Sequence, residues 1–120
     1  RSFLAARAAS RRAAKKPGML LCAECAAELG PREPWAACPE CRGSWLKEAD
    51  LGGLLAKKKK PAREWTAEMG AVTFVCPECA KPLDAGRFVG EDFAVFRCGP
   101  CAGVWLGAAE RISFELRVLS

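Results

Sequence analysis

Hydrophobic residues of this chain gather in two stretches, one in each half, where they alternate with polar residues and turn-forming residues. The later stretch, GRFVGEDFAVFRC, has apolar runs on both sides of a Gly-Glu-Asp turn, which predicts a hairpin with strands over 87–89 and 93–97. The earlier stretch, ELGPREPWAAC, is shorter and contains Pro31 and Pro34. We therefore expect a stubbier hairpin there, with its strands at an edge.

Three other segments favour helix. Segments 47–60 and 107–120, KEADLGGLLAKKKK and GAAERISFELRVLS, each follow a Trp-Leu pair. The N-terminal segment 1–19 is rich in alanine and ends at Pro17-Gly18, so its helix propensity is high. No run of eighteen apolar residues occurs, so we predict no transmembrane segment.

The cysteines form a pattern that repeats. All eight fall into four C-x-x-C pairs, with 12 residues between Cys25 and Cys38 and 18 between Cys79 and Cys98. These separations are close to those of four-cysteine zinc sites. Two self-similar halves favour two sequential sites over a cross-braced arrangement, in which alternate pairs share a metal. The predicted ligands of two Zn²⁺ ions are Cys22, Cys25, Cys38 and Cys41, and Cys76, Cys79, Cys98 and Cys101.

Bound metal explains how so short a chain folds. At 120 residues the chain makes one ordinary domain or two very small modules, and modules below about 40 residues rarely bury enough apolar surface to fold unaided. Zinc binding that is coupled to folding supplies about 10–16 kcal/mol at neutral pH. We therefore expect the metal to stabilise each half.

These sites are predicted to be structural. Four thiolates close the coordination sphere, whereas a catalytic zinc keeps one position open for water. The chain contains no histidine, and the acidic residues inside the C-x-x-C turns, Glu24, Glu40 and Glu78, are expected to point to solvent. We therefore predict no catalytic residues and no enzyme activity.

Other roles for the cysteines fit less well. Disulfides suit an exported protein, but no secretory signal is visible, and adjacent C-x-x-C pairs are a poor framework for cross-linking distant loops. A thioredoxin-type redox pair needs a βαβ context, for which neither half has room. Iron suits the same four ligands, so the choice between zinc and iron stays open.

The pattern C-P-x-C…C-P-x-C-x-G-x-W-L, followed by an acidic residue and a leucine, resembles the transcription factor IIB-like zinc-finger family, a zinc ribbon of small bacterial proteins. The resemblance covers 20–55 and 74–116, as two tandem copies. The resemblance is specific to this family because metal binding by four cysteines does not itself require the Gly-x-Trp-Leu motif. Where the family has a helix-capping Asp after Trp-Leu, this chain has Lys47 and Gly107. The family name by itself does not imply a role in transcription.

The resemblance implies a small metal-stabilised α+β fold of two tandem zinc ribbons, each a short β-hairpin with zinc knuckles followed by a short helix. The predicted segments are a basic tail, helical or disordered, over 1–19, ribbon 1 with its helix over 20–56, a basic linker over 57–70, and ribbon 2 with its helix over 71–120. Whether the ribbons pack together or move independently stays open.

The shared tryptophans, Trp45 and Trp105, are expected to pack over their own knuckle and hairpin. The alternative is an exposed aromatic platform for a base or a peptide. Trp65 lies outside the shared motif, just after the basic linker, and is the tryptophan that we most expect to anchor a neighbouring molecule.

Charge is unevenly distributed along the chain, whose formal net charge is +5. Residues 1–19 hold six basic and no acidic side chains. Residues 20–56 hold three basic and six acidic side chains, and residues 71–120 hold five basic and six acidic side chains. Ribbons that grip nucleic acid are expected to show a basic face, so any nucleic-acid contact should use the tail and the linker. A helical tail aligns Arg7, Arg11 and Lys15 in one i, i+4 row. The candidate partner-binding residues are Trp65, Arg7, Arg11, Arg12, Lys15, Lys16, Lys57, Lys58, Lys59 and Lys60; a solvated tail and linker is the plainer interpretation.

Three functions fit these features, in this order. The first is a non-catalytic zinc-binding adaptor that docks on a protein partner or larger assembly through its ribbons. The second is a nucleic-acid-associated protein, linked to transcription or translation, that binds through its tail and linker. The third is a thiol redox or metal-responsive switch. No small-molecule substrate is inferred.

Metal-binding thiols predict a reducing compartment, the cytoplasm. The Arg-rich, acid-free tail also resembles an organelle transit peptide. The chain begins at Arg1 rather than Met, which fits either a processed product or part of a longer protein.

Overall fold

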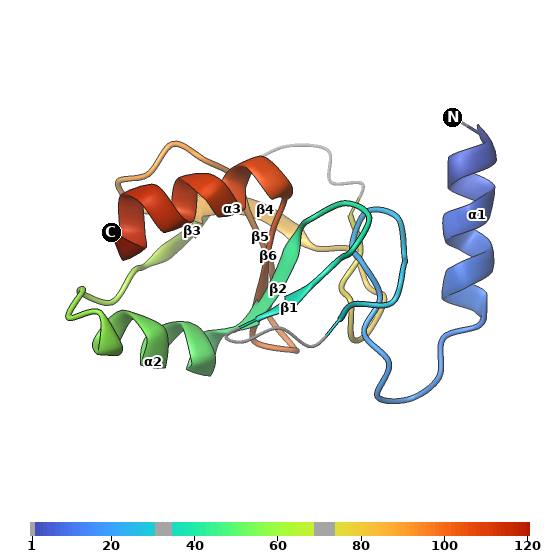
Figure 1. Cartoon of the computed structure of the whole chain (residues 1–120), viewed down its shortest axis with the longest axis horizontal. Helices are drawn as coiled ribbons and strands as arrows, with labels where there is room; N and C mark the ends of the chain where they lie inside the picture. The colour runs from blue at the N-terminus through green and yellow to red at the C-terminus, as the bar shows by residue number, and fades with distance from the viewer. Residues whose placement is uncertain (1, 31–34, 69–73) are drawn as a thin grey trace.

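The computed structural model describes residues 2–30, 35–68 and 74–120 and is shown in Figure 1. Two helices cover one sheet, and a third helix lies apart from them. The elements in chain order are α1 (Ser2–Ala13), β1 (Ala36–Ala37), β2 (Ser44–Lys47), α2 (Glu48–Lys57), β3 (Trp65–Ala67), β4 (Asp84–Phe88), β5 (Val95–Cys98), β6 (Gly103–Leu106), α3 (Ala108–Phe114) and the π-helical segment η1 (Glu115–Leu119).

Both halves of the chain share this sheet, which is antiparallel and has the strand order β1-β2-β6-β5-β4-β3. Strands β2 and β6, which carry the two Gly-x-Trp-Leu motifs, pair with each other at its centre. Trp45 lies opposite Trp105 in that pair, and Leu46 lies opposite Val104. Ser44 lies opposite Leu106, and this pair is related to the pair of Leu46 and Val104 by exchanging the two motifs. The register is therefore symmetric about the two tryptophans. The two ribbons are therefore not independent modules, because their central strands pair with each other in one sheet.

Alternate residues along the central strands serve two different hydrophobic clusters. Leu46, Val104 and Leu106 join the larger cluster, together with the apolar residues of α2, α3 and η1. Trp45 and Trp105 join a second cluster that contains the buried cysteines. Because successive side chains of a strand point to opposite faces, helices cover one face of the sheet and the cysteine loops cover the other.

Helix α1 lies beyond the cysteine loops, at one end of the molecule, and the C-terminal end of α2 lies at the other (Figure 1). The principal extents of the molecule are 42 × 30 × 24 Å. Ala8 of α1 is buried against Leu21 and Ala26, with Met19 beside them. This small apolar contact fixes α1 near the first pair of cysteines.

The predicted α+β fold is confirmed, with corrections to the second hairpin. Strands were expected over 87–89 and 93–97, but β4 ends at Phe88 and β5 begins at Val95. Gly90 has a φ of 90°, which turns the chain immediately after β4. Phe93 lies outside β5, and its buried side chain packs against Phe88.

In the first half, the expected edge position is confirmed, because the two-residue β1 lies at the edge of the sheet, but β1 pairs with β2 rather than within the predicted hairpin. Among the described residues of that stretch, the pairing is a single bridge between Gly30 and Ala37. Pro31 and Pro34 lie outside the described residues. Both ribbon helices begin directly after Lys47 and Gly107, and neither residue makes a side-chain capping bond. None of the helices in the described segments is long and apolar enough to cross a bilayer.

The stretch predicted as a basic linker, 57–70, contains ordered structure. It holds the last residue of α2 and the edge strand β3, which pairs with β4 through Trp65 opposite Phe88 and Ala67 opposite Gly86. Gly86 has no side chain, and the Thr66 carbonyl oxygen and the ring of Trp65 occupy the space where a Cβ would lie. A glycine within a strand thus lets a segment from the linker close the sheet.

Candidate metal centres

Eight cysteines form two clusters, as the sequence predicted. One contains Cys22, Cys25, Cys38 and Cys41, the other Cys76, Cys79, Cys98 and Cys101, and within each cluster the Sγ atoms all lie within 4.8 Å of one another. A tetrahedral zinc with Zn–S bonds of about 2.3 Å places its sulfurs about 3.8 Å apart. The Sγ atoms of Cys25 and Cys38 lie 3.7 Å apart, as do those of Cys79 and Cys98. Both clusters therefore fit a four-sulfur metal site, with sequential rather than cross-braced ligands.

Backbone amides point at the first sulfur of three of the four C-x-x-C turns. Cys22 Sγ accepts N–H bonds from Glu24 and Cys25 at 3.3 and 3.4 Å. Cys38 and Cys76 accept the same pair of bonds from the two residues at equivalent positions. Such bonds favour the thiolate, which is the form that binds metal.

All four turns share a second backbone feature. The residue after the second cysteine has a positive φ: 63° at Ala26, 66° at Arg42, 61° at Ala80 and 51° at Ala102. A residue other than glycine pays about 1–2 kcal/mol for this left-handed conformation. The conformation folds each turn back on itself, so that the Ala80 N–H bonds the Cys76 carbonyl at 3.0 Å. The turns are thus strained, and a metal held by the four sulfurs would offset that strain.

Burial controls ionisation of the thiols. It raises the pKa of Cys22 and Cys76 well above the usual thiol value, that of Cys41 to about 12 and that of Cys101 to about 11. Burial also opposes ionisation of Cys25, but its backbone bond from Ala27 and bonds from neighbouring cysteines lower its pKa. Several negative charges are therefore unfavourable together in each cluster unless a cation binds among them.

Each tryptophan of the shared motif reaches the knuckle of the opposite half. Trp45 Nε1 donates to the Glu78 carboxylate at 2.9 Å, and Trp105 Nε1 donates to the Glu24 carboxylate at 3.3 Å. The expectation that Glu24 and Glu78 point only to solvent is therefore wrong. It treated each C-x-x-C turn as isolated, whereas the pairing of β2 with β6 brings an indole N–H to each carboxylate.

Two backbone bonds repeat this cross-half pattern. The Leu21 N–H donates to the Pro77 carbonyl, and the Val75 N–H donates to the Ala23 carbonyl, both at 3.2 Å. Each bond joins the residue before one knuckle's first cysteine to the residue after the other's. The two clusters are therefore held together by their own first turns.

Glycines make room for the tryptophans. A Cβ at Gly43 would overlap the Trp105 ring, and a Cβ at Gly103 would overlap the Trp45 ring. The glycine of each Gly-x-Trp-Leu motif thus serves the tryptophan of the other copy. As expected, both tryptophans are buried and contribute to a core, but that core is shared between the halves.

Lys47, which replaces the helix-capping Asp of the family pattern, also joins the halves. Lys47 Nζ bonds the Glu78 carboxylate at 2.8 Å and contacts the Cys101 carbonyl. Burial opposes ionisation of Glu78, but the bonds from Lys47 and Trp45 outweigh it and keep its pKa below the usual value. Glu78 is therefore a charged acceptor for two side chains of the first half.

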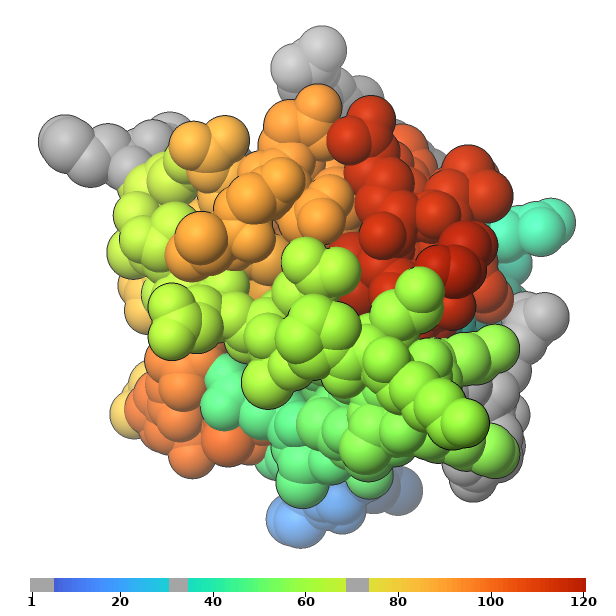
Figure 2. Space-filling model, turned by 90° about the vertical axis from the view of Figure 1, so that its left-hand side faces the viewer, coloured from blue at the N-terminus to red at the C-terminus, as the bar shows by residue number. Residues whose placement is uncertain are grey.

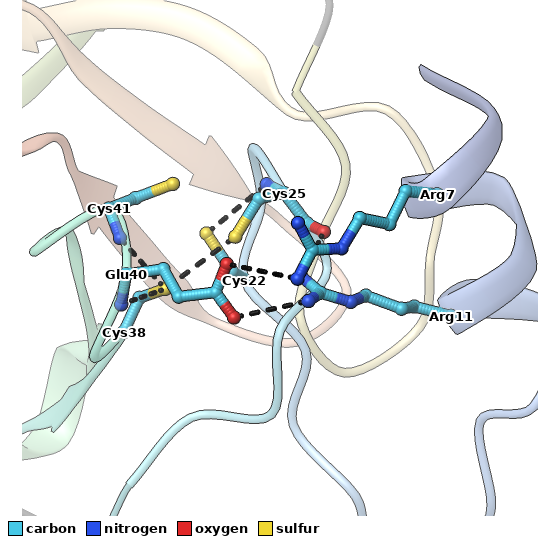
Figure 3. A network of polar contacts seen from close by, with 7 residues as sticks. All are labelled: Arg7, Arg11, Cys22, Cys25, Cys38, Glu40 and Cys41. Atoms are coloured by element: carbon cyan, nitrogen blue, oxygen red, sulfur yellow. Dashed lines mark hydrogen bonds and ion pairs between the residues drawn. The ribbon is translucent and has the colours of Figure 1, made fainter. Parts of the chain in front are cut away.

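The basic tail lies against the first cluster. Figure 3 shows Arg7 and Arg11 of α1 turned toward Glu40, at 3.9 and 3.1 Å. Arg11 also donates to the Cys25 carbonyl at 3.1 Å, and Arg12 donates to the Ala23 carbonyl at 3.2 Å. The predicted row of Arg7, Arg11 and Lys15 is not a continuous helical row, because α1 ends at Ala13.

The remaining candidate partner-binding residues lie away from both clusters, except for the tail lysines. Lys15 and Lys16 follow α1, and Lys57 to Lys60 surround the C-terminal end of α2, where Lys60 Nζ bonds the Ser120 carbonyl at 2.5 Å. Trp65 lies in β3, and its indole donates to the Val95 carbonyl at 2.9 Å. The guanidinium of Arg97 lies 5.7 Å from the Trp65 ring centre. A partner-binding role for these residues stays a prediction.

Comparison with known proteins supports this description for the second half. Residues 75–110 match the family of the transcription factor zinc-finger, a zinc ribbon of the transcription factor IIB type. No curated protein and no solved structure gives a significant match. Residues 75–110 are therefore similar to a zinc ribbon of the transcription factor IIB type, and the four-cysteine cluster at 22–41 is consistent with a second zinc ribbon in the same chain.

Proposed function

We propose that this chain is a non-catalytic adaptor, which holds one Zn²⁺ in each cluster and docks on a protein partner as a single two-ribbon unit. The observation that carries the proposal is the inward orientation of the tail arginines. Arg7 and Arg11 contact Glu40, and Arg12 contacts a knuckle carbonyl. The most basic segment of the chain is thus engaged by the chain's own first cluster.

The four-sulfur composition of each cluster supports a structural metal. Four cysteines leave no open coordination position for a substrate or an activated water. Zinc is the usual occupant of such sites, and the observed sulfur separation of 3.7 Å suits its bond length. The thiols suit a reducing compartment such as the cytoplasm, which we include in the proposal.

Positions of the basic segments favour a protein partner over nucleic acid. Helix α1 and the Lys57 to Lys60 segment lie at opposite ends of the molecule (Figure 1). A nucleic acid that used both would have to follow the longest dimension, 42 Å, across ribbons that hold more acidic than basic residues. Phosphate contacts supply most of the affinity of nucleic-acid binders, and the two basic segments do not form one continuous surface within the described part of the chain.

The proposal is tested with the metal-loaded full chain. Fluorescence anisotropy with a labelled DNA duplex and a labelled RNA strand, as a function of salt, measures nucleic-acid binding. In parallel, nuclease-treated cell extract is passed over the immobilised chain, over a chain that starts at Met19, and over Cys76→Ser. We expect no nucleic-acid binding at physiological salt, and one protein retained by the first two chains but not by Cys76→Ser. Salt-sensitive nucleic-acid binding that is lost when Lys57 to Lys60 are replaced by glutamine would overturn the proposal.

A further inference from the structure

We infer that a cavity between α2 and β3 is the docking site for the partner, and that it takes one bulky apolar side chain of an acidic peptide segment. This inference rests on the proposed adaptor function and names the chemistry of the partner. The cavity has a volume of about 500 Å³, which lies within the range of about 300–1,000 Å³ typical of protein binding pockets.

The inner surface of the cavity is apolar. Leu51 and Leu55 of α2, Phe88 of β4 and Val104 of β6 line it. All four are at most 6% exposed, so they form a fixed surface rather than loose side chains. Burying a Leu- or Phe-sized side chain against such a surface is worth about 1.5–3 kcal/mol.

The polar part of the cavity wall favours an anion. Arg63, Arg97 and Glu48 line the wall, and Arg97 and Glu48 are paired with each other, which leaves Arg63 as the charged group of the wall that can meet a ligand. Arg63 has a weaker partner, Glu91, at 3.5 Å. Its Nε is buried and has no hydrogen-bond acceptor among the described residues. A carboxylate next to the inserted apolar side chain would satisfy that donor, because buried polar groups without a partner are costly.

Positive charge continues beyond the cavity. Leu55 and Ala62 both line the cavity, and the segment that connects them contains the exposed lysines Lys57 to Lys59. Figure 2 shows this segment, in yellow-green, lying between α2 and the C-terminal helical segment on the face turned to the viewer. Residues 57–64 hold five basic side chains and one acidic one, Glu64. A ligand with acidic residues on both sides of its apolar anchor therefore complements this surface.

A glycine keeps one side of the cavity clear. Helix α2 contains Gly52 and Gly53 in its middle, where each glycine costs about 1 kcal/mol relative to alanine. An added Cβ at either position meets no atom within 4 Å, so packing does not explain them. Gly52 lines the cavity and Gly53 does not. A side chain at Gly52 would project into the space that the ligand uses.

Trp65 does not offer a platform for a nucleobase. Its indole N–H is bound to the Val95 carbonyl, and its ring lies over Gly86 and beside the Arg97 guanidinium. Base stacking needs an open aromatic face. The aliphatic surface formed by α2 is therefore the better recognition element, and it suits a peptide side chain.

The test uses the metal-loaded full chain and a fluorescein-labelled peptide, Asp-Glu-Phe-Asp-Glu. Matched peptides replace Phe by Ala, or the acidic residues by their amides. Matched proteins are Gly52→Leu, which fills the cavity, and Gly53→Leu, which makes the same change on α2 outside it. Helix content and metal stoichiometry are measured for both. We expect the wild type and Gly53→Leu to bind the acidic Phe peptide alike, and Gly52→Leu to bind about tenfold or more weakly.

Replacing Phe by Ala should cause a similar loss, and Arg63→Gln should weaken binding and reduce its salt dependence. Equal binding by Gly52→Leu and Gly53→Leu would overturn the inference, as would no binding by the wild type or preference for a labelled oligonucleotide. If the retained cell protein binds Gly52→Leu as well as wild type, the cavity is not the site but the adaptor function stands. Salt-sensitive nucleic-acid binding by the full chain would, in contrast, overturn the adaptor function itself.

Discussion

The indole of Trp45, in the first half of the chain, donates a 2.9 Å hydrogen bond to Glu78, which lies between two metal-binding cysteines of the second half. The reciprocal bond runs from Trp105 to Glu24. Each half therefore completes the surroundings of the other's cluster. Stability, metal binding and the rigidity of the two-ribbon unit depend on the same few residues.

Trp45→Phe should lower the free energy of unfolding of the metal-loaded protein by about 1–3 kcal/mol, because it removes a hydrogen bond to a charged acceptor while keeping most of the aromatic packing. Urea unfolding followed by circular dichroism measures this change. Glu78→Gln keeps an acceptor and should cost less. An unchanged unfolding midpoint in Trp45→Phe would show that the bond contributes no net stability.

Breaking one cluster should weaken metal binding at the other. Cys76→Ser with Cys98→Ser disrupts the second knuckle, whose contacts reach Trp45 and the Ala23 carbonyl. Coupling of about 1–3 kcal/mol is typical between linked sites, so zinc affinity at the first cluster should fall about five- to 150-fold. Competition with a chelating dye measures that affinity. The converse variant, Cys22→Ser with Cys38→Ser, should weaken the second cluster equally, and independent affinities would contradict the shared architecture.

Gly103→Ala should destabilise the protein by about 1–3 kcal/mol, because the new methyl group overlaps the Trp45 ring in a close-packed core. Gly53→Ala is the matched control. It lies in α2 with free space around its Cβ position, and it should stabilise the helix by up to about 1 kcal/mol. Thermal unfolding of the two variants should therefore shift in opposite directions. Destabilisation by both would mean that the overlap at Gly103 is not the cause.

Ala80→Gly should stabilise the protein by about 1 kcal/mol, because glycine adopts a φ of 61° without the penalty that alanine pays. Ala26→Gly should gain less. Its φ is similar, but Ala26 is 1% exposed and its methyl group packs against Leu21 and Ala8. Chemical unfolding with excess zinc compares the two, and an equal gain would indicate that packing of the Ala26 methyl group does not matter.

The two four-cysteine clusters were predictable because they follow from the spacing of the cysteines along the chain. The two cysteines of a C-x-x-C turn are separated by only two residues, so the turn brings their sulfurs together whatever the rest of the chain does. The ribbon helices were predictable for a similar reason, since each begins one residue after a Trp-Leu pair.

Pairing of β2 with β6 was not predictable in this way. It joins residues about 60 positions apart, and a four-residue strand carries no signal for which strand it meets. One hint is visible in the sequence: both halves have Glu before the second cysteine of their first pair, at Glu24 and Glu78. Glu40 has the same position in another knuckle, so the hint alone does not identify the two that accept an indole.

The lysines that precede residues 65–67 predict a linker there rather than a strand. Their strand depends on a partner, Gly86, whose missing side chain admits the Trp65 ring. The hydrogen bonds that Arg11 and Arg12 make to the first cluster also cannot be predicted from the sequence. Their acceptors are backbone carbonyls of Cys25 and Ala23, which every sequence contains and no pattern marks.

The register of Trp45 opposite Trp105, with each tryptophan serving the other half, is the geometry of an isologous dimer contained in one chain. In a dimer, an interface of this kind forms only when protomers meet, so its population depends on concentration. Here the segment between α2 and β3 replaces that encounter with an intramolecular one. The assembled surface is therefore as complete in a very dilute solution as in a concentrated one.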